Sequence, residues 1–163
     1  MFFTEEFQSH GMVFLWTPKE ELARTVSTML SAGYQYVENL IWVRKYANNR
    51  VRPMTVAQSS EAVAPLTGTV KQTLLFFRRF KKGRELELRH QRTADVVIDF
   101  VKPPSTWTQA EDLERKPDRI YETIETLLPN AVYSHERKEG RLLELWARKG
   151  AARRHWTAVF EAV

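Results

Sequence analysis

The sequence contains no cysteine, and its 163 residues include only six glycines and four histidines. Without cysteine, disulfide frameworks, cysteine-ligated zinc sites and thiol catalysis are excluded. The glycines form neither a G-x-G-x-x-G fingerprint nor a P-loop, so a phosphate-cradling loop of either type is not expected. The histidines do not follow the spacing of metal ligands, and no metal site is expected at His10, His90, His135 or His155.

Long hydrophobic runs are also missing. The longest charge-free stretch, residues 25–37, is shorter than the ~18 residues of a membrane span and is rich in Ser, Thr and Gln. Residues 1–6 contain neither a basic nor an apolar segment, so no secretory signal is expected. The sequence therefore predicts no membrane partner.

The composition is that of a globular chain, with 43% hydrophobic and 28% charged residues. Twenty-five basic against 20 acidic side chains give a formal net charge of +5. A mild positive balance suits a nucleic-acid partner without requiring one. The length is that of one domain, which we expect to span residues 1–163.

Apolar runs and helix-end signals predict that strands and helices alternate. Residues 12–16 are continuously apolar, as expected of a strand that is buried on both faces. Thr17 and Glu20 match a capping box, and Gly33 matches the C′ position at the end of the helix that would follow. Residues 34–44 are rich in β-branched and aromatic side chains and predict a second strand, parallel to the first.

A second helix is expected to begin at Pro117. Further strands are expected at residues 73–80, 95–101, 131–134, 141–147 and 156–163, and long loops at residues 45–70 and 102–115. This alternation predicts an α/β fold in which helices flank a mostly parallel sheet.

Positive charge concentrates in residues 71–92, which contain eight basic and two acidic side chains with three phenylalanines among them. Such a segment can be a hairpin that contacts nucleic-acid phosphates, or a solvated strand edge whose charges oppose aggregation. Both interpretations remain open. A second basic cluster surrounds a turn at residues 148–154. The candidate nucleic-acid-binding residues are Lys71, Arg78, Arg79, Lys81, Lys82, Arg84, Arg89, Arg148, Lys149, Arg153 and Arg154.

Four stretches of the chain, in order, carry a family resemblance. Residues 11–16 read Gly-Met-Val-Phe-Leu-Trp, and residues 33–44 begin with Gly-Tyr and end with Trp-Val-Arg. Residues 116–129 begin with Lys-Pro-Asp-Arg-Ile-Tyr, and residues 143–148 end with Trp-Ala-Arg before a further tryptophan, Trp156. This ordered set resembles the eukaryotic adenine N(6)-methyltransferases, the family of the mRNA N(6)-methyladenosine writer and of relatives that modify DNA.

The resemblance implies an incomplete Rossmann-like methyltransferase fold. The catalytic tetrapeptide of the family, Asp-Pro-Pro-Trp, would lie upstream of Gly11. Residues 1–10 contain neither Pro nor Trp, so we expect this domain to lack the strand that carries the motif. No catalytic residue is therefore assigned.

The cofactor contacts of the family are also replaced. The family binds S-adenosylmethionine through His-Asn-Val and Gly-Asn-Gln, whereas the corresponding residues here are Gly150-Ala151-Ala152 and Phe160-Glu161-Ala162. Lys116 and Arg148 match positions near the cofactor, but two cations without the amide contacts do not form a cofactor site. We expect this chain to bind no cofactor.

In this family an active subunit often pairs with a degenerate one. The resemblance implies that this chain is no enzyme by itself and forms a nuclear heterodimer with an active adenine methyltransferase subunit, which holds S-adenosylmethionine. It would stabilise that subunit and help to bind the substrate, with DNA slightly favoured over mRNA. Two alternatives remain: a fragment or isoform of an active methyltransferase, and a free-standing basic nucleic-acid-binding module.

Overall fold

The computed structural model describes residues 4–45, 70–84, 86, 88–89, 94–100, 116–136, 138–147 and 153–160. The chain divides into two compact units. The first comprises Met1–Glu85 and Thr93–Arg115, and the second Leu86–Arg92 and Lys116–Val163. Most of the two predicted loops lies outside the described residues. That residues 1–163 form one methyltransferase-like domain stays a prediction.

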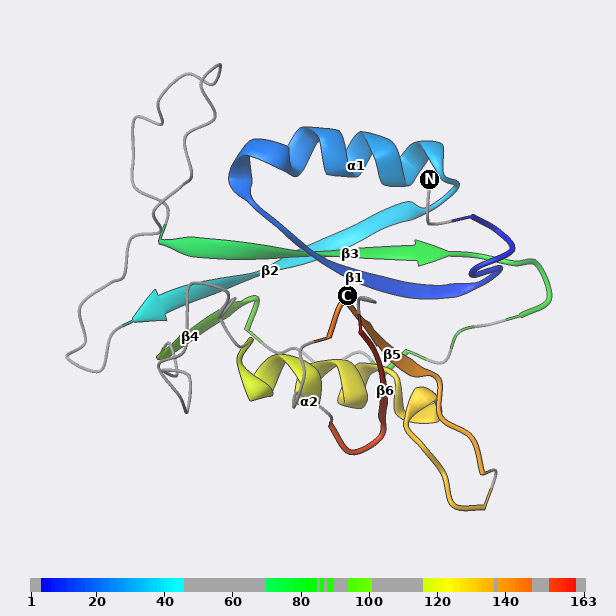
Figure 1. The fold of residues 1–163 in the computed structure, drawn as a ribbon. Coiled ribbons are helices and arrows are strands. Elements are labelled where there is room, and N and C mark those ends of the chain that lie inside the picture. Colours follow the sequence, from blue (N-terminus) through cyan, green and yellow to red (C-terminus); the bar gives the residue numbers. More distant parts are fainter. Residues whose placement is uncertain are drawn as a thin grey trace. The chain divides into compact units, whose positions relative to one another are not determined.

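The first unit is built on a four-stranded sheet with the strand order β1-β3-β2-β4 (Figure 1). Its central strand β3 pairs antiparallel with both β1 and β2, whereas β2 pairs parallel with the edge strand β4. The sheet is therefore mixed. The strands are β1 (Gly11–Thr17), β2 (Gln35–Lys45), β3 (Lys71–Arg79) and β4 (Val96–Phe100).

The expected fold class, an incomplete Rossmann-like fold with a mostly parallel sheet flanked by helices, is wrong. β1 and β2 run in the same direction, but β3 lies between them and runs the opposite way. The described residues contain only two α-helices, α1 (Leu22–Ser31) and α2 (Asp118–Leu127). The apolar run of β3 indicates that both faces of this strand are covered. It carries no information on the direction of the neighbouring strands.

The helix α1 begins differently from the prediction. The expected capping box does not form, because Thr17 is still part of β1 and its hydroxyl donates to the carbonyl of Leu15 at 3.4 Å. A 3₁₀ turn, η1 (Lys19–Glu21), precedes the helix instead.

The end of α1 agrees with the prediction at Gly33, which has a φ of +85°. The N–H of Gly33 donates to the carbonyl of Leu30 at 2.9 Å, and the N–H of Tyr34 donates to that of Met29 at 3.0 Å. These two bonds form a Schellman motif, in which glycine adopts the left-handed conformation at little cost. The motif also directs Tyr34 into the core beside Met29.

Two apolar layers cover β3. On the face towards α1, Leu75 and Phe77 of β3 form a buried cluster with Met29 and Tyr34. On the opposite face, Phe76 packs edge-to-face against Phe14 with ring centroids 4.9 Å apart. Fully burying one such side chain contributes about 1.5–3 kcal/mol. β3 is therefore the strand around which the core of the first unit is built.

Arg79 places a buried positive charge at the end of β3, where its exposed fraction is 8%. Its guanidinium donates to the backbone carbonyl of Gln8 at 2.7 Å and to that of Ala32, and it lies 4.1 Å from the ring centroid of Tyr34. Ala32 is the C-cap of α1, so the cation lies at the negative end of the helix dipole. Arg79 thereby joins β3, α1 and the N-terminal segment.

The second unit contains α2, the 3₁₀ turn η2 (Pro129–Ala131) and a parallel pair of strands, β5 (Leu142–Leu145) and β6 (Trp156–Val159). The start of α2 after Pro117 confirms the sequence prediction, and Ile120 and Ile124 are buried as its apolar face requires. The expected strand at residues 131–134 is replaced by η2 and an isolated bridge between Ser134 and Glu139.

Replacing Arg79 by Met should lower the free energy of unfolding by about 2–3 kcal/mol, because charged hydrogen bonds to two carbonyls are lost. Urea denaturation measures this difference. The matched control is Arg78→Met at the adjacent, exposed position, which should change stability by less than about 0.5 kcal/mol. An equal decrease in the free energy of unfolding in the two variants would contradict the structural role of Arg79.

Candidate nucleic-acid interface

A tight turn at residues 81–84 follows β3. The N–H of Arg84 donates to the carbonyl of Lys81 at 3.0 Å, and these two residues form an isolated antiparallel bridge. Gly83 has a φ of +81°, and apart from its two chain neighbours no described residue lies within 4 Å of the position that a Cβ would occupy there. The local backbone therefore favours glycine, and the turn faces open space at this point.

Exposed cations group at this turn. Arg78, Lys81, Lys82 and Arg84 are all exposed, and Phe80 among them is 62% exposed. We name these five residues the basic turn. Arg78 is oriented by β2, because its Nε donates to Oε1 of Gln35 at 3.0 Å. Within the described part of the chain, the two terminal nitrogens of its guanidinium remain available to a ligand. The basic turn can therefore offer several cations to neighbouring phosphates.

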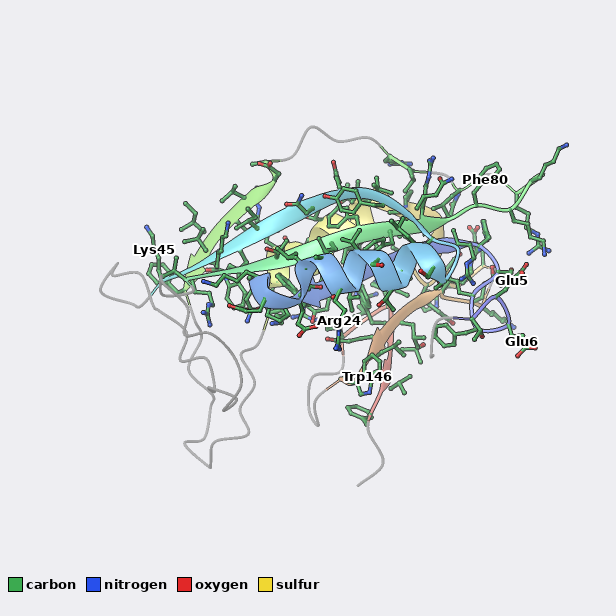
Figure 2. The ribbon with its side chains drawn as sticks, turned by 90° about the horizontal axis from the view of Figure 1, so that it is seen from above. Glu5, Glu6, Arg24, Lys45, Phe80 and Trp146 are labelled. Carbon is green, nitrogen blue, oxygen red and sulfur yellow. The ribbon has the colours of Figure 1, made fainter. Side chains whose placement is uncertain are left out.

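Two carboxylates lie at the same end of the first unit. Figure 2 labels Glu5 and Glu6 beside the end of the sheet from which Phe80 projects. The segment is held there by Gln8, which accepts from Arg79 and whose Nε2 donates to the carbonyl of Met12 at 3.2 Å. The four cations of the basic turn outnumber these two carboxylates, so the local charge stays positive.

The other candidates on β3 lie apart from the basic turn. Lys71 is exposed at the opposite end of the strand, roughly 25 Å away at the rise of a β-strand. Arg79 is buried, and its guanidinium is occupied by Gln8, Ala32 and Tyr34. Arg78 and Arg79 look alike in the sequence, but they lie on opposite faces of β3.

The second unit contains the remaining described candidates. Arg89 and Arg154 are exposed, whereas Arg153 forms an ion pair with Asp118 at 2.5 Å and lies 3.6 Å from the ring centroid of Tyr121. Arg153 therefore packs against α2, at the helix N-terminus where Asp118 is favourably placed.

Several residues singled out by the sequence are not described. Arg148 and Lys149 lie outside the described residues, as do residues 150–152 and 161–162, whose comparison with the cofactor contacts of the methyltransferases stays a resemblance. Lys116 is half-buried directly before α2. Their assigned roles stay predictions.

Tyr121 is the centre of a half-buried polar network that the sequence did not indicate. Its hydroxyl donates to Oε1 of Glu144 at 2.6 Å, and its ring lies edge-to-face against Trp156 at 5.2 Å. The indole N–H of Trp156 donates to Oε1 of Glu125 at 2.7 Å. Burial, followed by the hydrogen bond and charge of Glu144, raises the pKa of Tyr121 above its ordinary value of about 10. The network ties α2 to β5 and β6.

The stability of the protein should therefore depend on Tyr121 at alkaline pH. The pKa of Tyr121 is raised in the folded state, so the neutral hydroxyl stabilises the fold fully below about pH 10, the pKa of an unfolded tyrosine. This contribution to the free energy of unfolding is lost as the pH rises through the folded-state pKa. Tyr121→Phe should cost about 1 kcal/mol at pH 7 through the lost hydrogen bond, and this deficit should shrink above pH 10. Urea denaturation of both proteins between pH 7 and about pH 11 tests this, and a deficit that stays constant would contradict it.

Other kinds of site find no support in the described part of the chain. No three histidine or acidic side chains gather there in a way that could hold a metal ion. None of the described helices is both long and apolar enough to span a membrane.

Comparison with known proteins leaves the family unassigned. No protein-family model matches the chain, and a search of curated proteins finds no match either. The candidate interface therefore depends on the geometry of the basic turn alone.

Proposed function

We propose that this chain is a non-catalytic subunit that binds nucleic acid through the basic turn and acts together with a separate, active adenine N(6)-methyltransferase. The observation that carries the binding role is the grouping of four exposed cations around one tight turn at the end of β3. Clustered Lys and Arg side chains neutralise phosphates and release counterions, which is the main source of sequence-independent affinity for nucleic acids.

The composition of the basic turn supports a positioning role. Residues 78–84 read Arg-Arg-Phe-Lys-Lys-Gly-Arg and contain no Asn or Gln, the side chains that pair with adenine edges. Contacts to phosphate hold a nucleic acid in place but carry no sequence information. The basic turn would therefore position a substrate through its phosphates, without an amide contact that selects adenine.

The non-catalytic role is supported by the sequence. Methyl transfer to an exocyclic amine requires a polar clamp on the nitrogen and a preorganised donor site. In the stretches that resemble the methyltransferase family, residues 150–152 and 160–162 contain none of the amide side chains that bind S-adenosylmethionine. The partner subunit would then supply the cofactor site and the chemistry.

Replacing the four cations of the basic turn by Gln should weaken nucleic-acid binding at least about tenfold near 0.1 M salt. Four phosphate contacts predict that log K falls with log salt at a slope of roughly −3 to −4, and the variant should flatten this slope. Fluorescence anisotropy with a labelled 20-nucleotide probe at several salt concentrations measures both quantities.

A matched control separates a local site from overall charge. Neutralising Arg24, Arg119, Lys138 and Arg141, which are also exposed, removes the same charge from other surfaces and should change the affinity less than about threefold. If the basic turn is only a solvated strand edge, neither variant affects binding. Equal losses in the two variants would indicate a net-charge effect and would contradict the site.

The partner role is tested separately. Co-expression with an active adenine methyltransferase subunit should yield a one-to-one complex by native mass measurement, because folding and association of such subunits are linked. The complex should bind one S-adenosylmethionine in titration calorimetry, and this chain alone should bind none. Monomeric elution of a chain that melts sharply on its own would instead support a free-standing module.

A further inference from the structure

We infer that Phe80 stacks on an unpaired nucleobase, which makes the basic turn a site for single-stranded nucleic acid. This inference rests on the proposed function, because the neighbouring cations would hold the phosphates of the same strand. It adds to that function the structural class of the ligand, which phosphate contacts alone leave open.

Phe80 is the most exposed large apolar side chain among the described residues. It directly follows the last residue of β3, and its side chain is exposed like that of Arg78 two positions earlier. The intervening Arg79 is turned inward and buried against Tyr34. Phe80 therefore lies between outward-facing cations, Arg78 on one side and Lys81 and Lys82 on the other.

A protein pocket is a poor match for this arrangement. Docking of Phe80 into an apolar pocket would bring the surrounding charges out of water, and burying a charge without a partner is costly. A nucleic acid offers complementary groups for both parts of the basic turn. Its phosphates pair with the cations, and every base presents a π-face to an aromatic ring.

Whether the nucleic acid is single-stranded or double-stranded then decides whether Phe80 can reach the face of a base. In a duplex the faces of the bases are stacked on one another, and an apolar wedge reaches them only at the cost of unstacking a base step. In a single-stranded nucleic acid the face of a base is open and can stack on an aromatic side chain, while neighbouring cations contact the phosphates. Because every base presents a π-face of this kind, stacking by Phe80 should tolerate any sequence.

The test compares the full wild-type chain with Phe80→Ala and Phe80→Tyr. The probes are a 20-nucleotide single-stranded DNA, the equivalent RNA, the DNA duplex and an abasic DNA strand of equal length, all in fluorescence anisotropy. Phe80→Ala should weaken binding to both single strands by about 5- to 150-fold, the loss expected for one stacked base. Phe80→Tyr keeps an aromatic ring and should stay within about threefold of wild type.

The duplex and the abasic strand are internal controls. Both present phosphates without an open base, so Phe80→Ala should change their affinity by less than about twofold. The wild-type chain should also bind the abasic strand about as weakly as Phe80→Ala binds the normal strand. Urea denaturation should give equal stabilities for the variants, because Phe80 is exposed.

Failure of this inference can be told apart from failure of the proposed function. If the wild-type chain binds none of the probes, the proposed function is overturned and the inference with it. If it binds with a salt-dependent affinity that Phe80→Ala leaves unchanged on single strands, the stacking role alone is overturned. The stacking role is equally overturned if Phe80→Ala leaves nucleic-acid binding intact and abolishes capture of the methyltransferase subunit, since the ring then docks on a protein.

Discussion

Antiparallel pairing of β3 with β1 on one side and β2 on the other holds the first unit together. Residues from Thr73 to Phe77 are buried, so this strand contributes to the apolar layers on both faces of the sheet. The helix α1 covers the layer that contains Leu75 and Phe77, and its Schellman end places Tyr34 in the same layer. The other elements of the unit are arranged around this strand.

The candidate interface follows from the same strand. β3 leaves the core with Arg79 facing α1 and Arg78 facing solvent, because successive side chains of a strand alternate. The buried guanidinium of Arg79 anchors the point at which the chain emerges, and the tight turn at residues 81–84 begins two residues later. A binding site that extends directly from a rigid strand is held more precisely than one on a long loop.

Positive charge has a structural role and a proposed binding role in this chain. Arg79 in the first unit and Arg153 in the second lie over tyrosine rings and hold secondary structure elements together. Arg78, Lys81, Lys82 and Arg84 face solvent around Phe80 and form the proposed phosphate contacts. Exposure of the guanidinium or ammonium group, and not the residue type, separates the two roles.

The sequence by itself determined the features that depend on neighbouring residues. It located the described strands, the start of α2 after Pro117 and the end of α1 at Gly33, because apolar periodicity and helix-end signals act over a few positions. It also identified the basic segment as a candidate site. Only the tertiary structure decided that β3 runs antiparallel between β1 and β2, since an apolar strand is equally well buried in either direction. It also decided that Arg79 is buried while Arg78 and Phe80 are exposed, because that distinction depends on which face of β3 the helix α1 covers.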